Sequence, residues 1–318
     1  MTHQPHSFRL TFGAYAAEIL ATGATLSRLT YAGRDLILPA GSPHAPGFPG
    51  ALLAPWPNRT VDGRYTFNGQ LLEVPINEAE RHHALHGLAY ALEFAPTGPP
   101  QAATLELTAM LDPTPGYPWQ LRFTAHFTLD EAGLRYGVTA ENLSQNAAPY
   151  GASTHPYLIA GPGSIDDWEL ELAVSERLEV TPDRLIPQHL TPAAGFTGRL
   201  GSTSLDHAFT GIGWHEGTAD DTASEAAAAT ATLRAPGGTG VVMEWDRSCP
   251  WVQIFTCDLG ASDPAHRSAV ALEPMTCAPD AFNDGAYPFD TGLLTLDAGQ
   301  SHTTLWRLTA LEGAGTAR

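Results

Sequence analysis

The fold is decided by the stretch LRFTAHFTL, residues Leu121 to Leu129. Apolar and polar side chains alternate along it, and this period of two is typical of a strand with one buried face. A turn follows near Glu131 to Gly133, and the strand pattern returns from Leu134 to Ala140. The two runs therefore predict an antiparallel pair of strands joined by a short turn.

A second hairpin is predicted where Asn68-Gly69 separates Arg64–Phe67 from Gln70–Val74, because Asn-Gly supplies the positive φ values of a type I′ turn. The other strands that we expect are Thr104–Leu111, Glu169–Val174, Ala231–Arg234, Val241–Trp245, Val252–Thr256, Ala269–Leu272 and Thr303–Leu308. The 31 glycines and 26 prolines break the chain at short intervals. No amphipathic helical stretch of about twelve or more residues with caps is found.

Many short strands with frequent turns favour an all-β fold, a large antiparallel β-sandwich. No internal repeat and no change of composition marks a linker, so residues 1–318 are expected to form a single domain. The segment from Ala219 to Thr230 is rich in Ala, Asp, Thr and Glu. We interpret it as a surface excursion between strands rather than a short helix.

The composition excludes several classes of function. The chain has 34 acidic and 16 basic residues and a net charge of −18, which repels phosphate backbones and acidic lipid headgroups. We therefore expect neither a nucleic-acid partner nor a membrane partner. Every basic residue is an arginine, whereas Schiff-base chemistry, pyridoxal-phosphate anchoring and the P-loop each need a lysine. Because arginine keeps its proton, proton transfer must fall to His, Asp, Glu, Tyr or Cys.

The cysteines and the amino-terminal region suggest in which cellular compartment the protein is found. Cys249, Cys257 and Cys277 have no metal-binding spacing and predict neither a disulfide framework nor a structural zinc site. The region from Ala14 to Leu26 carries a glutamate and a glycine that the central segment of a signal peptide avoids. No run of about eighteen apolar residues occurs. We expect a soluble, cytoplasmic protein.

Polar residues collect in loops flanked by glycine and proline, where a rigid sheet can position binding groups. Asn58-Arg59 presents an amide beside a guanidinium, which either pairs with a carboxylate or binds a ligand. His82, His83 and His86 lie within five residues and suggest a metal site. Their spacing lacks a helix and a nearby carboxylate, so we predict no metal.

Three more candidates lie where loops are expected to meet strands. His155 precedes a proline, which holds its backbone extended. Asp206 is a lone aspartate between apolar neighbours and either caps a turn or binds a ligand. Glu273 ends the apolar strand Ala269–Leu272. A buried carboxylate is costly without partners, so Glu273 is expected to reach water or to face a polar pocket.

Together these segments resemble the aldose 1-epimerase (galactose mutarotase) family from about Leu10 to Leu308. The matching elements are Asn58-Arg59, Leu85-His86-Gly87, His155-Pro156-Tyr157, Asp206, and Glu273-Pro274 with Pro279-Asp280-Ala281-Phe282-Asn283. Each short motif alone is weak, but the ordered set with family-like spacing is specific. Leu88, Leu158 and Phe255 depart from the family's pattern, and these departures leave the sugar selectivity open.

The resemblance implies the galactose mutarotase-like supersandwich fold. It also implies a mutarotase, which interconverts the α and β anomers of a hexose by opening the ring. Glu273 would be the base that takes the C1 hydroxyl proton, and His155 the acid that protonates the ring oxygen. An anionic Glu273 close by would favour the protonated imidazole. This chemistry needs no redox step, no metal and no cofactor.

The partner that the resemblance implies is a small-molecule aldose. The residues expected to bind it are Arg59, His86, Asp206, Asn58, Tyr157 and Gln253. Arg59 and His86 would donate to sugar oxygens, whereas Asp206 would accept from two adjacent hydroxyls. Trp56 is expected either against an apolar face of the sugar or in the core.

Three other functions stay open. A non-catalytic sugar-binding module on the same sandwich would need the binding residues but no acid–base pair. A mutarotase for a charged sugar such as a hexose 6-phosphate would need arginines grouped about Arg59 or Arg64. A metal-dependent β-barrel enzyme would use His82, His83 and His86.

Overall fold

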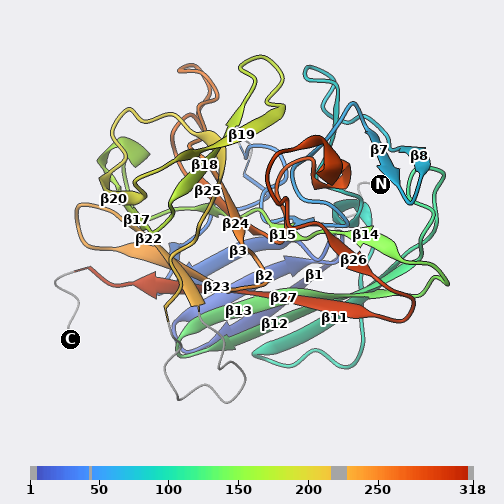
Figure 1. The fold of residues 1–318 in the computed structure, drawn as a ribbon. Helices are drawn as coiled ribbons and strands as arrows, with labels where there is room; N and C mark the ends of the chain where they lie inside the picture. The colour runs from blue at the N-terminus through green and yellow to red at the C-terminus, as the bar shows by residue number, and fades with distance from the viewer. Residues whose placement is uncertain (1–5, 43–44, 216–227, 314–318) are drawn as a thin grey trace.

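The computed structural model describes residues 6–42, 45–215 and 228–313, and almost all of their regular structure is antiparallel β-sheet (Figure 1). The helices among these residues are three short 3₁₀ segments, η1 (Ala89–Ala91), η2 (Ile165–Asp167) and η3 (Ala281–Ala286). None of the described helices is long and apolar enough to cross a membrane. The predicted all-β fold is confirmed.

The largest sheet has nine strands and contains the stretch LRFTAHFTL. In spatial order the strands are β10 (Ala95–Pro96), β11 (Thr104–Leu111), β12 (Leu121–Asp130), β13 (Gly133–Asn142), β27 (Ser301–Leu311), β23 (Gly240–Asp246), β22 (Ala228–Arg234), β17 (Glu169–Leu172) and β20 (Phe196–Arg199). Leu129 of β12 pairs with Leu134 of β13, and buried residues alternate with more exposed ones along β12. The predicted hairpin is therefore present.

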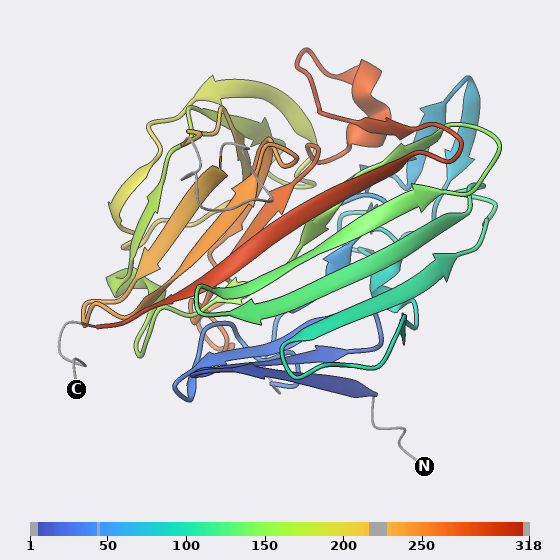
Figure 2. The same ribbon diagram turned by 90° about the horizontal axis from the view of Figure 1, so that it is seen from below.

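Two smaller sheets pack against the largest one. The four-stranded sheet consists of β1 (Ser7–Phe12), β2 (Tyr15–Leu20), β3 (Leu26–Tyr31) and β4 (Arg34–Asp35). The six-stranded sheet consists, in spatial order, of β16 (Tyr157–Leu158), β25 (Val270–Met275), β24 (Trp251–Phe255), β21 (Asp206–Thr210), β18 (Glu176–Val180) and β19 (Pro187–Pro192). Figure 2 shows the four-stranded sheet lying across the β11–β13 half of the nine-stranded sheet.

Four two-stranded pairs complete the described strands. They are β5 (Leu52–Leu53) with β15 (Ser153–Thr154), β6 (Arg59–Val61) with β9 (His83–Leu85), β7 (Arg64–Phe67) with β8 (Gln70–Glu73), and β14 (Ala148–Tyr150) with β26 (Leu294–Leu296). The β7–β8 pair is the hairpin predicted at Asn68-Gly69, and these two residues have φ values of +50° and +78°.

One hydrophobic cluster joins the three main sheets. It contains Leu10 and Ile19 from the four-stranded sheet, Phe123 and Trp306 from the nine-stranded sheet, and Ile254 from the six-stranded sheet. All five side chains are almost completely buried. Because removing apolar surface from water gains about 25 cal/mol for each Å², this shared core holds the sheets together.

Strand β25 lies between this core and the candidate site. All six of its residues are buried. Val270 and Leu272 belong to the main cluster, whereas Ala271 and Met275 belong to two smaller clusters. Because side chains alternate along a strand, Glu273 lies on the same face as Ala271 and Met275, away from the main core. The strand was expected to end at Leu272 but continues through Glu273.

The predicted strands are present, and their ends differ from the expected ones by at most three residues. The alternation of apolar and polar residues did not predict β1–β4 or β18–β21. Several of these strands are short or half-exposed. Of the predicted surface excursion, residues 219–227 lie outside the described residues. Its last three residues, 228–230, are the start of β22, so that strand begins earlier than predicted.

Gly87 is expected to be required for the fold around His86. Its φ is +72°, and a Cβ there would lie 2.1 Å from the carbonyl oxygen of Ala54. Gly69 has a similar φ of +78°, but a Cβ there would have no other heavy atom within 4 Å. We expect Gly87→Ala to lower the free energy of unfolding by about 2 kcal/mol more than Gly69→Ala does. Urea denaturation of both variants measures this difference, and equal losses would show that the approach to Ala54 is unimportant.

Candidate functional site

Two of the matched motifs meet at the paired strands β6 and β9. Arg59 opposes Leu85 in this pair, and the N–H of His86 donates to the carbonyl oxygen of Asn58 over 2.8 Å. Asn58 and His86 have left-handed backbones, with φ values of +54° and +65°. Such values are uncommon outside glycine and persist where the surroundings impose them. The strand pair therefore fixes Arg59 and His86 on one short scaffold.

Two hydrogen bonds of its own backbone and the pairing of the next strand place His155 beside Glu273. The N–H of His155 donates to the carbonyl oxygen of Ala51 over 3.1 Å, and its own carbonyl oxygen accepts from the N–H of Gly50 over 2.8 Å. Just beyond this loop, β16 pairs with β25, the strand that carries Glu273. The imidazole Nε2 of His155 consequently lies 3.3 Å from Oε1 of Glu273.

Asp206 and Gln253 bring a second carboxylate to the same face of the six-stranded sheet. Gln253 opposes Glu273 across β24 and β25, and its Nε2 donates to Oδ1 of Asp206 over 2.6 Å. Nη2 of Arg59 lies 3.9 Å from Oδ2 of Asp206. The side chain of Asp206 is 32% exposed, whereas those of His155 and Glu273 are 7% and 2% exposed. Asp206 therefore lies on the solvent side of the cluster.

Three buried polar atoms of the cluster have no hydrogen-bond partner among the described residues. They are Nδ1 of His86, Nδ1 of His155 and Oε2 of Glu273. The rings of His86 and His155 also meet edge to face, with centroids 5.2 Å apart. Because buried polar groups are normally paired, three unpaired atoms gathered in one place make this cluster a candidate site for a polar ligand.

Burial sets the protonation of the His155–Glu273 pair. It raises the pKa of Glu273 well above its ordinary value, and Asp206 raises this pKa further while Arg59 opposes the rise. Burial lowers the pKa of His155 to about 4 and also lowers the pKa of His86. We expected an anionic Glu273 to favour the protonated imidazole of His155. Burial instead opposes the charged form of both groups, and it is the largest influence on each pKa.

Two residues beside the cluster were not predicted from the sequence. Glu78 accepts two hydrogen bonds from Arg59, 2.8 Å from Nε and 2.9 Å from Nη2. Phe48 packs edge to face on His86 with ring centroids 4.8 Å apart, and its φ is +59°. Both stand in loops rich in proline, glycine or acidic residues, and such loops recur along this chain. No local pattern therefore marks either residue.

Tyr157 and Trp56 both pack against other aromatic rings of the protein. The ring of Tyr157 lies against that of His155 with centroids 4.8 Å apart, and its hydroxyl donates to the carbonyl oxygen of Gly47 over 3.0 Å. Trp56 is 3% exposed and packs against Phe282 in the main core. Of the two places expected for Trp56, the structure shows the core. Tyr157 lies at the cluster and buttresses His155.

The three neighbouring histidines do not share a site. His82 is exposed, and its Nδ1 lies 3.2 Å from the carboxylate of Asp62. Nδ1 of His83 accepts from the N–H of Asp62 over 3.2 Å, so its Nε2 donates to the carbonyl oxygen of Arg184 over 2.8 Å. The ring of His86 meets His155 instead. The metal site considered for these three histidines is therefore wrong.

A different set of donors is close enough to hold a metal ion. Among the residues that the structure describes, one nitrogen of His86, one nitrogen of His155 and one oxygen of Glu273 lie within 4.8 Å of one another. Two imidazoles and a carboxylate are groups that zinc accepts. The same groups form an acid–base pair with a neighbouring hydrogen-bonding imidazole, an arrangement that acts without a metal.

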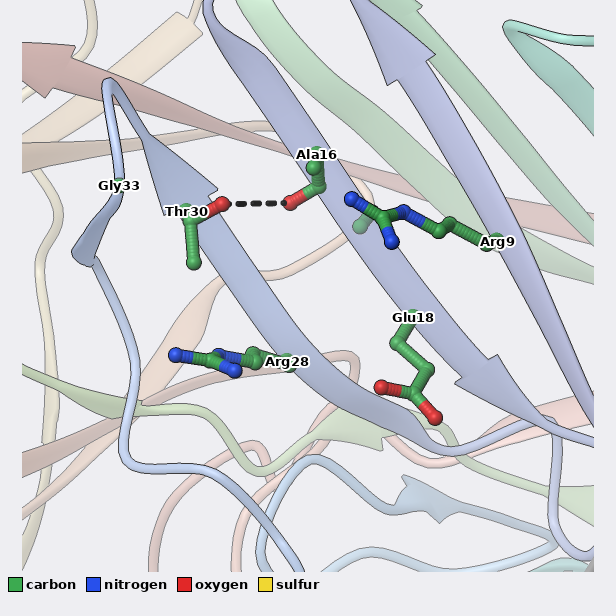
Figure 3. Close-up of a pocket in the computed structure, with 7 residues that line it drawn as sticks. Arg9, Ala16, Glu18, Arg28, Thr30 and Gly33 are labelled. Carbon is green, nitrogen blue, oxygen red and sulfur yellow. Dashed lines mark hydrogen bonds between the residues drawn. The ribbon is translucent and has the colours of Figure 1, made fainter.

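A separate pocket lies on the exposed face of the four-stranded sheet (Figure 3). Arg9, Glu18 and Arg28 form a row across β1, β2 and β3, and Arg28 also pairs with Asp35 over 2.7 Å. The carboxylates offset the charge of the arginines, and none of the matched motif residues lines this pocket. We therefore place the candidate functional site at the His155–Glu273 cluster.

The chain superposes on solved structures over almost its whole length. A galactose mutarotase-like protein from Clostridium acetobutylicum aligns with a TM-score of 0.76 and 17% identity, covering 98% of this chain and 96% of that chain. The galactose 1-epimerase from Lactobacillus acidophilus NCFM aligns with a TM-score of 0.70 and 17% identity, covering 98% and 100%. The fold is that of the galactose mutarotase-like proteins.

Sequence comparison narrows this class to a family. The pattern of the family described as aldose 1-epimerase matches residues 6–308. The Escherichia coli (strain K12) protein YihR, described as uncharacterized, is 30% identical over 312 residues, which are 94% of this chain and 91% of YihR. The chain belongs to the aldose 1-epimerase family. The resemblance inferred from the motifs is confirmed.

Glu273→Gln is expected to stabilise the fold at neutral and alkaline pH. Since the folded-state pKa of Glu273 is raised above 4.5, the folded protein binds more protons than the unfolded chain above that pH. Stability is therefore lost as the pH rises from 4.5 towards the folded pKa, and glutamine, which has no charge, avoids this loss. Thermal unfolding between about pH 5 and about pH 9 should show a gain in Tm that grows to a few degrees.

The control is Glu80→Gln, which removes an exposed glutamate from the same protein. It measures the effect of losing one exposed carboxylate, against which the effect of Glu273→Gln is compared. A gain for Glu273→Gln that is equally large at about pH 5 and about pH 9 would contradict the raised pKa of Glu273.

Proposed function

We propose that the protein is a mutarotase that interconverts the α and β anomers of a hexose through the open-chain form. The observation that carries this proposal is the buried 3.3 Å contact between Nε2 of His155 and Oε1 of Glu273. Opening a hemiacetal ring needs one group that takes a proton and another that gives one, both beside the same sugar. Membership of the aldose 1-epimerase family supports an isomerase of this type.

The proposed reaction needs two proton transfers, one from the sugar to Glu273 and one from His155 to the sugar. The carboxylate of Glu273 takes the proton of the C1 hydroxyl, and the freed electron pair forms the C1 carbonyl. The bond between C1 and the ring oxygen breaks, and the ring oxygen takes a proton from the imidazolium of His155. Rotation about the C1–C2 bond then presents the other face of the aldehyde. Closure reverses the same transfers, so no oxidant or reductant is consumed.

The pair must hold one proton in total, and burial favours that number. A raised pKa of Glu273 and a lowered pKa of His155 keep one proton on the pair over a wide range of pH. Sugar hydroxyls that donate to Oε2 of Glu273 would favour the charged arrangement, in which the proton is on His155. Ring opening returns the pair to its neutral arrangement, which burial stabilises.

The surrounding groups would orient the sugar. Asp206 offers carboxylate oxygens at the solvent side of the cluster, with one oxygen held by Gln253. The lowered pKa of His86 keeps its ring neutral, so one nitrogen donates and the other accepts. Asn58 acts on Arg59, because its Oδ1 accepts from the Arg59 N–H over 2.9 Å.

The charges about Arg59 favour a neutral sugar. Its guanidinium lies beside the carboxylates of Glu78 and Asp206, and Arg81 is also paired with Glu78. Arg64 is exposed and pairs with Glu73. A phosphorylated hexose would need cations that are free to bind its phosphate, and these arginines already have carboxylate partners.

Glu273→Ala and His155→Ala are each expected to lower kcat/KM by at least about a hundredfold, because each removes one of the two proton-transfer groups. Polarimetry on freshly dissolved α-galactose and α-glucose, corrected for the buffer rate, measures the loss. The matched control is His82→Ala, since His82 is an exposed histidine outside the cluster. It should keep the wild-type rate.

The same assay separates the alternatives. Near-wild-type rates in either alanine variant would remove that residue from the mechanism. A wild-type protein that binds these sugars without accelerating mutarotation would be a sugar-binding module. Glucose 6-phosphate that competes more strongly than glucose would identify a charged sugar as the substrate.

The pH profile is expected to have its acid limb near pH 4, where the His155–Glu273 pair gains its second proton. Below that limb the pair gains a second proton and Glu273 can no longer act as a base. Above it, the pair keeps one proton until Glu273 ionises, so kcat/KM should stay level across neutral pH. Initial mutarotation rates at a series of pH values test this. A fall in kcat/KM as the pH rises above about 6.5 would show that His155 loses its proton as an exposed imidazole does.

A further inference from the structure

We propose that Glu78 is a positioning residue that holds Arg59 away from Asp206, so that the Asp206 carboxylate stays available to sugar hydroxyls. This inference rests on the proposed mutarotase function, because it assigns a role within the same site. Neither the family match nor the motif residues point to Glu78, which lies in the loop between β8 and β9.

Glu78 engages Arg59 through two hydrogen bonds in a parallel fork. Its Oε2 accepts from Nε over 2.8 Å, and its Oε1 accepts from Nη2 over 2.9 Å. The side chains of Arg59 and Glu78 are only 10% and 12% exposed. Arg81 donates to Oε1 of Glu78 over 3.1 Å from the other side. Two-point pairing of this kind fixes the plane of a guanidinium as well as its distance.

The backbone of Arg59 is fixed independently of Glu78. The N–H of Asp280 donates to the carbonyl oxygen of Arg59 over 2.7 Å, and Oδ1 of Asp280 accepts from the N–H of Val61 over 2.7 Å. Together with the β6–β9 pairing, these bonds leave only the side chain of Arg59 free to move. Nη1 of Arg59 also donates to Oδ1 of Asn58, but over a longer distance of 3.4 Å. Glu78 accepts from both Nε and Nη2 and therefore has the larger part in fixing where the guanidinium points.

Without Glu78, the nearest carboxylate to the guanidinium is that of Asp206. Nη2 of Arg59 lies 3.9 Å from Oδ2 of Asp206, beyond hydrogen-bond distance but within reach of a small rotation. A buried guanidinium that has lost its partner would close this gap, because an unpaired buried charge is costly. The second oxygen of Asp206 is already bonded to Gln253. If Arg59 moved onto Oδ2, both carboxylate oxygens of Asp206 would be occupied.

Glu78 also offsets the positive charge beside the acid–base pair. The titratable and charged groups that face Glu273 are His155, His86, Asp206, Arg59 and Tyr157. Of these, Arg59 is the group that lowers the pKa of Glu273. Removing the charge of Glu78 would strengthen that influence. The alkaline limb of the pH profile, where Glu273 ionises, would then move to lower pH.

The experiment compares Glu78→Gln with Glu80→Gln in the full-length protein. Both variants remove one negative charge from the same loop, but Glu80 is exposed and contacts neither Arg59 nor Asp206. We expect Glu78→Gln to raise KM for galactose about tenfold with kcat changed less than about threefold, and to move the alkaline limb to lower pH. Glu80→Gln should match the wild type in all three measurements.

A double-mutant cycle tests whether Glu78 acts through Arg59. In an Arg59→Ala background, Glu78→Gln should change neither KM nor the alkaline limb further. An equal effect with and without Arg59, or identical behaviour of Glu78→Gln and Glu80→Gln, would overturn the proposal. If Glu78→Gln does not fold, Glu78→Asp keeps the charge at a greater distance and should raise KM without moving the limb.

If the protein is not a mutarotase, the experiments give a result that differs from a failure of the Glu78 proposal. A wild-type protein without mutarotation would refute that function, and the role of Glu78 would then be decided by galactose affinity measured by isothermal titration calorimetry. Weaker binding by Glu78→Gln, but not by Glu80→Gln, would still support the positioning role. Unchanged binding in both variants would refute it.

Discussion

The rest of the site depends on the withdrawal of one carboxyl group and one imidazole from water. In water Glu273 would be ionised and His155 would titrate near neutral pH, and each would act on its own. They lie 3.3 Å apart, and burial raises the pKa of Glu273 and lowers that of His155, which favours one proton on the pair. Such a pair is costly unless the backbone holds both groups in place. The strand pairing around β16 and β25 provides that support.

The supports of the cluster come from segments that are far apart in sequence. Asn58, Phe48, His86 and Asp280 all have left-handed backbones, with φ values between +54° and +65°. A single residue held this way costs of order 1–3 kcal/mol, so four of them around one cluster indicate a conformation imposed by the whole fold. The hydrogen bond from His86 to Asn58 and the bond from Asp280 to Arg59 tie these segments together.

Local alternation was enough to predict the long strands, because β11, β12, β13 and β27 each have one buried face. It could not predict that β25 runs past Glu273, since a charged residue in a wholly buried strand contradicts the local pattern. The motifs led to His86, His155, Asp206 and Glu273. Glu78 was not predicted because its importance comes from Arg59, its neighbour only in the folded chain. The lowered pKa of His155 could not be predicted for a similar reason, since desolvation is a property of the tertiary environment.

Strand β25 has a consequence for how this protein can evolve. One face of the strand supplies Val270 and Leu272 to the main hydrophobic cluster, and the other presents Glu273. A mutation that repacks the first face would also shift the carboxyl group on the second, so the hydrophobic core and the candidate site depend on the same few side chains. Sequence drift in the loop that holds Phe48, or at Asp206 where β21 begins, would leave this strand unchanged.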